Sequence, residues 1–196
     1  MQEKIRSIFT ENIQTQIACV ENLTPDIIKA VERIVETLIN GNRILCCGTG
    51  ISSGLAQLFT MHMIHKFETH RPSLPAFALG SDHIWLSQPY EEGELDSMYA
   101  KQVKVLGQPN DTLLVISPNG FCKPTIQAIE TAVTRDMFII ALTGADGGDI
   151  AGLLSTTDVE IRILSERTAR INELHHFIIN LLAEMVDKTL FNFENS

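Results

Sequence analysis

The stretch ILCCGTGISSG, residues 44–54, joins an apolar run to a glycine-containing loop and then to the start of an amphipathic segment. This order is typical of a buried strand followed by a helix. Such a loop can bring backbone N–H groups and a helix N-terminus against an anion. The spacing, G-x-G-x-x-x-G, matches neither the dinucleotide fingerprint nor the P-loop, so a plain strand-to-helix turn is the alternative interpretation.

Four further segments share the strand pattern, and helical patterns separate them. The middle strands are almost continuously apolar, which is typical of strands covered on both faces. We expect strands at 43–47, 75–79, 112–117, 137–142 and 159–163, and helices near 52–68, 94–106 and 124–134. The alternation predicts an α/β fold, in which a five-stranded parallel sheet has right-handed crossovers and helices on both faces.

Residues 1–41 are predicted to form a pair of helices ahead of the first strand. Apolar residues fall three or four apart over residues 1–20, and Thr24 and Pro25 have the types expected at the start of a second helix. Gly41 is a suitable stop. We therefore expect a single domain over 1–196, with the helical pair at 1–41 and an α/β core at 42–196.

The final helix, expected at 168–190, is apolar around most of its circumference. A helix of this kind is buried from more than one side. We therefore predict a helical bundle shared between copies of the chain, and a monomer covered by its own leading helices is the alternative. Beyond or at the helix end, Leu190, Phe191 and Phe193 are apolar residues that either fill an oligomer groove or contact a partner.

Composition excludes several classes of protein. The net charge is −9, from 15 Lys and Arg against 24 Asp and Glu, and no basic run offers a face for direct nucleic-acid binding. No run approaches the roughly 18 apolar residues of a membrane helix, and the N-terminus has no signal-peptide pattern. The four cysteines form no C-x-x-C pair, so we expect free thiols and a cytoplasmic location.

Two loops are candidates for anion binding, because ligands of open parallel sheets bind at the carboxyl ends of the strands. Gly50 and Ser52 belong to the loop after the first strand, and Ser117 and Asn119 to the loop after the third. The histidines show no pattern of three or four converging ligands, so we expect no metal and no other cofactor.

Five segments together resemble the sugar isomerase (SIS) domain family, within its phosphoheptose isomerase branch. They are ILCCGTGISS, FETHRPSLPAFAL, YAKQV, AVTRDMFIIALTGADGG and RTARINELHH, and the resemblance extends essentially from end to end. It implies a flavodoxin-like three-layer sandwich and a homotetramer built around a helical bundle, to which the N-terminal helices and the long C-terminal helix contribute. It also implies sugar-phosphate sites at subunit interfaces.

The chain departs from the isomerase pattern at four positions. Where the isomerases carry a histidine and a glutamate in the helix after the first loop, this chain has Leu58 and His62. Where they carry a glutamine and a histidine in the last helix, it has Asn172 and Asn180. We therefore expect no isomerase activity, because moving a proton between adjacent carbons needs a base. The alternative is an isomerase with an altered site, whose candidate residues are His62, Glu91, Glu173 and His175.

Within the branch, the chain is most similar to non-enzymatic members that associate with the replication initiator DnaA. This resemblance implies a tetramer that binds DnaA and promotes its assembly at the chromosomal origin. Leu190 and Phe191 are our candidate contact residues. Gly50, Ser52, Ser117 and Asn119 then form a weak or vestigial site for a sugar phosphate, because Ile51 and Cys122 replace residues usual in the family's loops.

Overall fold

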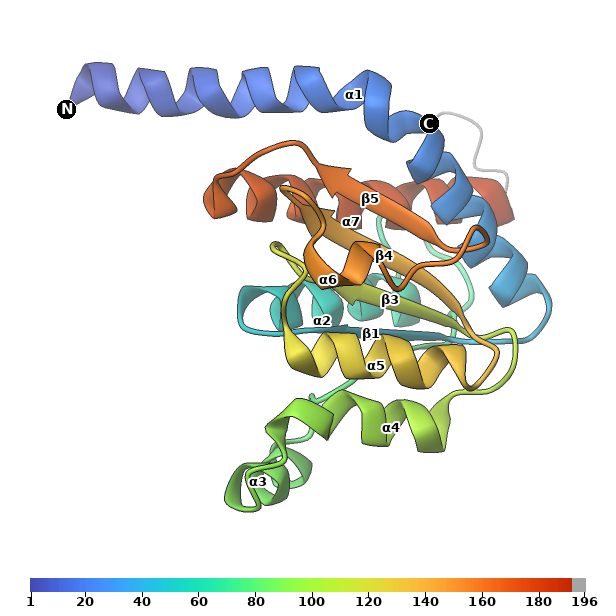
Figure 1. The fold of residues 1–196 in the computed structure, drawn as a ribbon. Helices are drawn as coiled ribbons and strands as arrows, with labels where there is room; N and C mark the ends of the chain where they lie inside the picture. The colour runs from blue at the N-terminus through green and yellow to red at the C-terminus, as the bar shows by residue number, and fades with distance from the viewer. Residues whose placement is uncertain (192–196) are drawn as a thin grey trace.

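The computed structural model describes residues 1–191, and its centre is a parallel five-stranded sheet in the order β2-β1-β3-β4-β5 (Figure 1). The strands are β1 (Ile44–Gly48), β2 (Ala76–Ala78), β3 (Thr112–Ile116), β4 (Phe138–Gly144) and β5 (Val159–Ile163). All four pairings are parallel. The fold class predicted from the sequence is confirmed, and each strand begins and ends within two residues of its predicted bounds.

Helices cover both faces of the sheet. Successive strand residues point to opposite faces, and because both sets are apolar, each face must be covered. Cys46 belongs to the core under α1 (Gln2–Ile39), α2 (Ile51–Ile64) and α7 (Thr168–Phe191). Its neighbour Cys47 belongs to the core on the other face. That face is covered by α4 (Met98–Leu106), α5 (Lys123–Val133) and the short α6 (Gly148–Ala151). The sandwich therefore has two apolar cores, one on each side of the strands.

One helix was absent from the sequence prediction. Helix α3 (His83–Glu91) follows β2 and leads through a 3₁₀ turn, Leu95–Ser97, into α4. Asp82 is its N-cap, and its carboxylate accepts hydrogen bonds from the backbone N–H groups of Ile84 and Trp85. That cap was the available signal, because aspartate is a preferred N-cap residue.

The predicted pair of N-terminal helices was wrong. Residues 2–39 form one helix, α1, with Pro25 inside it, and the helix bends along its length (Figure 1). Thr24 is no cap, since its hydroxyl donates to the carbonyl of Val20 one turn earlier. A proline removes one intrahelical hydrogen bond and kinks a helix, but helix-forming residues on both sides can continue through it.

Residues 2–20, which we call the α1 arm, extend beyond the sheet and lie near the start of α7 (Figure 1). The first half of the arm makes polar contacts near the start of α7: Arg170 donates to the carbonyl of Ile8 (3.0 Å), and Glu11 forms an ion pair with Arg167. At the other end of the arm, Cys19 is buried in the apolar core. Five apolar side chains of the arm are at least half exposed. We call these residues the apolar stripe: Ile5, Phe9, Ile13, Ile17 and Val20.

Candidate functional site

Strand β2 lies on one side of β1, whereas β3 lies on the other side, so the sheet has a crossover point between β1 and β3. The loops after β1 and β3 enclose a cavity of about 220 Å³. Such a crossover point at the carboxyl ends of the strands is where open α/β sheets bind ligands. The cavity, which we call the switch-point cavity, is lined by Thr49, Ile116, Ser117, Pro118, Asn119, Cys122 and Thr168. It contains two of the predicted anion-binding residues, Ser117 and Asn119.

The loop after β3 is held firmly by the loop after β4. Gly120 has φ +71°, and a Cβ there would lie 1.9 Å from the carbonyl oxygen of Gly147. The backbone N–H of Ile150 donates to the carbonyl of Gly120 (3.2 Å). Only glycine allows this close approach at this conformation. The conformation of this wall of the cavity is thus fixed by contacts within the chain.

Ser117 has the environment of a binding residue. Its side chain is 2% exposed, and its Oγ has no hydrogen-bond partner among the described residues. A buried hydroxyl without a partner is uncommon in proteins, because it loses its bonds to water. Asn119 is exposed, and its Oδ1 accepts from the backbone N–H of Phe121 (3.2 Å). Ser117 therefore retains a free donor for a ligand in this cavity.

Gly50 and Ser52 lie elsewhere. Gly50 has φ +63° at the N-cap of α2 and lines a neighbouring cavity. Ser52 is buried beneath the first loop, where a Cβ on Gly48 would lie 2.6 Å from the Cβ of Ser52. The close packing of Gly48 on Ser52 fixes the turn from β1 into α2. Ser52 is not among the residues that line either of these two cavities.

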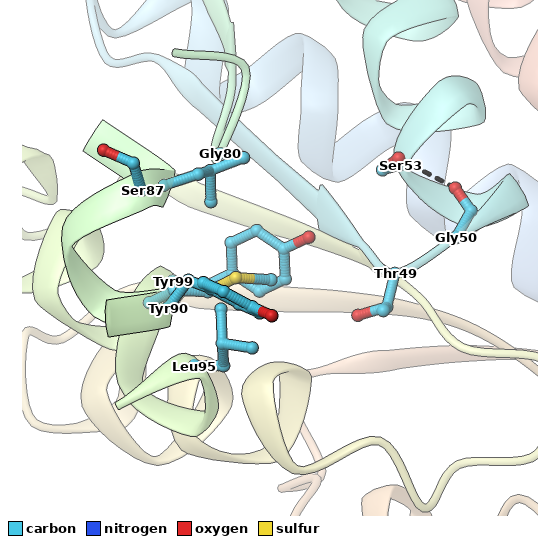
Figure 2. A pocket seen from close by; sticks show the side chains of 10 residues that line it. Thr49, Gly50, Ser53, Gly80, Ser87, Tyr90, Leu95 and Tyr99 are labelled. Carbon is cyan, nitrogen blue, oxygen red and sulfur yellow. Dashed lines mark hydrogen bonds between the residues drawn. The ribbon is translucent and has the colours of Figure 1, made fainter. Parts of the chain in front are cut away.

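The neighbouring cavity, of about 470 Å³, lies between the first loop and α3 and shares Thr49 with the switch-point cavity (Figure 2). Three of its hydroxyl groups already donate to backbone carbonyls: Ser53 to that of Gly50, Ser87 to that of Ile84, and Tyr99 to that of Gly48. Burial raises the pKa of Tyr99 to about 12. Its walls therefore offer mainly apolar and aromatic surface, including Leu86, Tyr90, Leu95 and Met98.

The second region of interest is the contact between α2 and α7, which we call the α2–α7 junction. His62 lies with its Nε2 3.1 Å from Oδ1 of Asn180, and its ring meets Phe67 edge-on at 5.0 Å between centroids. Leu58 packs against the core. Asn172 has a buried Oδ1 without a partner among the described residues. Within the described part of the chain, no three His, Cys, Asp or Glu side chains are grouped to hold a metal ion.

Two of the other candidates for an altered isomerase site, His175 and Glu173, already form hydrogen bonds within the chain. His175 is fully buried and donates from Nε2 to the carbonyl of Thr143 (2.9 Å). Burial lowers the pKa of His175 to about 4, so the ring is neutral at neutral pH. Glu173 accepts hydrogen bonds from Arg170 and Asn12, both at 2.5 Å. Glu91 lies at the end of α3.

A buried ion pair that sequence reasoning missed ties the junction together. Arg71, in the loop after α2, donates from Nε to Oδ1 of Asp187 on α7 (2.8 Å). Its other guanidinium nitrogens donate to the carbonyls of Met63 and His62, both at 2.6 Å. These carbonyls belong to the last turn of α2, so one side chain caps α2 and anchors α7. No local pattern marks this pairing.

The predicted partner-contact residues lie at the end of α7. Leu190 is half-buried and packs against the core of the α1, α2 and α7 face. Phe191 is half-buried and is the last described residue, so Phe193 lies outside the described residues. None of the described helices is long and apolar enough to cross a membrane.

Comparison with known proteins gives concordant matches. The family model described as "SIS domain" matches residues 9–144. The chain is 52% identical over 191 residues, 97% of each chain, to the "DnaA initiator-associating protein DiaA" of Escherichia coli and of Shigella boydii. It superimposes on a phosphoheptose isomerase from Francisella tularensis with a TM-score of 0.92 and 37% identity, covering 95% of this chain and 98% of that one. A phosphoheptose isomerase from Neisseria gonorrhoeae gives 0.90 and 35%, with the same coverage.

Proposed function

Because this chain belongs to the SIS domain family, we propose that it is a non-enzymatic replication factor that binds the initiator DnaA and promotes its assembly at the chromosomal origin. The observation that carries this proposal is the end-to-end identity with relatives named for their association with DnaA. Such a role requires a cytoplasmic location. The acidic net charge suits a partner with a basic surface.

The state of the α2–α7 junction supports the absence of isomerase chemistry. Aldose–ketose isomerisation needs a base that can move a proton between adjacent carbons. The four positions matched to the isomerases hold Leu58, His62, Asn172 and Asn180. Leucine has no proton to exchange, and the Nε2 of His62 lies against Asn180. None of the four side chains is a carboxylate, and the one imidazole among them has its Nδ1 buried without a partner among the described residues.

The exposed apolar surface supports a homotetramer. Besides the apolar stripe, Phe177 on α7 is 55% exposed, and it borders a groove of about 250 Å³ between α1 and α7. A contiguous apolar surface of this kind is typical of a protein interface. Copies of the chain that pack α1 and α7 together would bury it. A symmetric tetramer would then offer several equal sites to DnaA, which raises the effective concentration of each contact.

Leu190 and Phe191 remain our candidates for the DnaA contact, because they are apolar and only half-buried at the end of α7. The switch-point cavity is our candidate for a retained anion site, with Ser117 as the donor and Asn119 at its rim. Gly50 and Ser52 would contribute through the conformation of the first loop. A sugar phosphate would occupy this site weakly and without turnover.

A pull-down with purified DnaA tests the partner. Full-length wild type should retain DnaA, while Leu190→Ala and Phe191→Ala should each lower the retained amount at least about fivefold, a loss of about 1 kcal/mol. Val105→Ala is the matched control, because Val105 is a 76% exposed apolar residue on α4, on the opposite face of the sheet. Unchanged binding in both variants would remove our contact assignment, and no binding by wild type would remove the function.

The likeness to solved phosphoheptose isomerases makes a divergent isomerase the second candidate. Turnover of sedoheptulose 7-phosphate with bound zinc in wild type would overturn the non-enzymatic reading. We expect neither. The combined variant Leu58→His, His62→Glu, Asn172→Gln and Asn180→His should gain zinc binding, because it restores the residue types of the isomerases at one place in the fold. Equilibrium dialysis against zinc would measure this gain.

A further inference from the structure

One group in the switch-point cavity has no part in either DnaA binding or isomerase chemistry: the thiol of Cys122. Cys122 occupies the N-cap position of α5, where its side chain makes no capping hydrogen bond. It is half-buried, lines the cavity, and has its Sγ 3.0 Å from Oγ1 of Thr49. The hydroxyl therefore lies close enough to stabilise the sulfur when it carries negative charge.

The other three cysteines, Cys19, Cys46 and Cys47, are all buried. Burial raises the pKa of Cys46 to about 12 and that of Cys47 well above its usual value. Because the thiolate is the reactive form, the thiols of Cys46 and Cys47 are inert in the folded chain. Cys19 lines the groove between α1 and α7 but is only 3% exposed, so Cys122 is the most accessible thiol of the chain.

The surroundings of Cys122 indicate what kind of molecule would reach it. The unpartnered hydroxyl of Ser117 lines the same cavity and is shielded from water. The first turn of α5 begins directly after Cys122, but Pro124 has no N–H and the N–H groups of Thr125 and Ile126 donate to the carbonyl of Cys122. The hydroxyl of Ser117 is therefore the main feature that favours an anion, and the N-terminal end of the α5 dipole adds to it. A carboxylate carried on a small thiol or disulfide would therefore be held beside the sulfur.

We propose that Cys122 is a thiolation site, which accepts an anionic, low-molecular-weight thiol from its disulfide and forms a mixed disulfide in the switch-point cavity. The thiol of Cys122 gives its proton to solvent, and its sulfur attacks one sulfur of the small disulfide. The new S–S bond forms as the old one breaks, and the other half leaves as a thiolate with the bonding electron pair. Cys122 is oxidised and the leaving half is reduced.

The adduct would occupy the cavity and exclude other anions from it. This consequence rests on the proposed anion site, whereas the thiolation itself does not. It would also separate Cys122 from Thr49 and so break the hydrogen bond that joins these two residues across the cavity. Anion binding in the switch-point cavity would then depend on the ratio of small thiols to their disulfides around the protein.

Oxidised glutathione is the probe, with full-length wild type, Cys122→Ser and Ser117→Ala compared by intact mass and peptide mapping. We expect one glutathionyl group per folded wild-type chain, on Cys122 and removable by dithiothreitol, and none on Cys122→Ser. A urea-denatured sample checks that every cysteine can react. Modification of a different cysteine in the folded chain, an internal disulfide, or an unmodified folded chain would each overturn the proposal.

Two further arms separate the parts of the argument. The neutral hydroxyethyl disulfide should react with Cys122 at least about fivefold more slowly than glutathione disulfide, and Ser117→Ala should reduce this preference, because a charge-assisted hydrogen bond is lost. Equal rates would contradict the anionic preference. Inorganic phosphate should slow glutathionylation in wild type. Thiolation without any slowing by phosphate would remove the anion site of the proposed function and leave the thiolation standing.

Discussion

The switch-point cavity and the α2–α7 junction differ in how their polar side chains are surrounded. The switch-point cavity is enclosed by the loops after β1 and β3 and contains the hydroxyl of Ser117, which has no partner among the described residues. The second half of α2 forms the α2–α7 junction, where His62 lies against Asn180 and Arg71 joins Asp187. Both regions contain buried polar atoms without a partner among the described residues: Oγ of Ser117 in the cavity, and Nδ1 of His62, Oδ1 of Asn172 and Oδ2 of Asp187 at the junction. The difference is that the cavity leaves space beside its hydroxyl, whereas the junction is a packed contact between two helices.

If the junction is a structural contact, breaking its ion pair should have the largest effect on stability. Arg71→Ala leaves the carboxylate of Asp187 buried without its cation, since both side chains are nearly inaccessible. We expect the free energy of unfolding to fall by about 3–5 kcal/mol in urea titrations. Lys188→Ala, which removes an exposed pair with Glu184, should change it by less than about 1 kcal/mol. Similar losses in both variants would deny the junction this role.

The rigidity of the cavity loop can be broken at Gly120. The Cβ of Gly120→Ala would collide with the carbonyl of Gly147, in addition to the strain of a positive φ. We expect a loss of about 3 kcal/mol in the free energy of unfolding and loss of phosphate binding. Gly93→Ala is the control, because Gly93 has the same φ of +71° with nothing within 4 Å, and should lose about 1 kcal/mol. Equal losses would show that strain alone matters at Gly120.

Acid should weaken the fold through His175, a buried residue of α7 whose ring donates to the carbonyl of Thr143 on β4. The pKa of His175 is about 4 in the folded chain against 6.5 for an ordinary histidine, so the unfolded chain binds more protons between these values. Stability is therefore complete above about pH 6.5 and falls with pH, by about 2 kcal/mol from pH 7 to pH 5. His175→Gln should flatten this slope in urea titrations. The exposed neighbour variant His176→Gln should keep it.

The smallest expected effect on stability is at Ser117. Its hydroxyl has no partner to lose, so Ser117→Ala should change the free energy of unfolding by less than about 0.5 kcal/mol. Phosphate affinity, measured by calorimetry, should fall about tenfold, because a hydrogen bond to a charged group is lost. Ser53→Ala, whose hydroxyl donates to Gly50 in the neighbouring cavity, should leave that affinity unchanged. A normal affinity in Ser117→Ala would show that the hydroxyl of Ser117 binds no anion.

The sequence predicted the sheet and most helices because apolar periodicity is local information. It failed where the outcome depends on a single residue in context, as at Pro25, which bends α1 without ending it. Of the candidate site, Ser117 and Asn119 were predicted because a loop after a parallel strand lies at a known edge. The pairing of Arg71 with Asp187 was not, because it joins residues 116 positions apart and no local signal encodes it.

The α1 arm also has a consequence for hydrogen exchange. Apart from Cys19 near its end, the contacts of the arm with the rest of the chain are few and polar, and a lone helix of such length is only marginally stable in water. If neighbouring copies cover the apolar stripe, the amides of residues 2–20 are protected by association, whereas those of β3 and β4 are protected by the fold. Dilution should then speed deuterium uptake in the arm alone, making assembly visible as a concentration-dependent local opening.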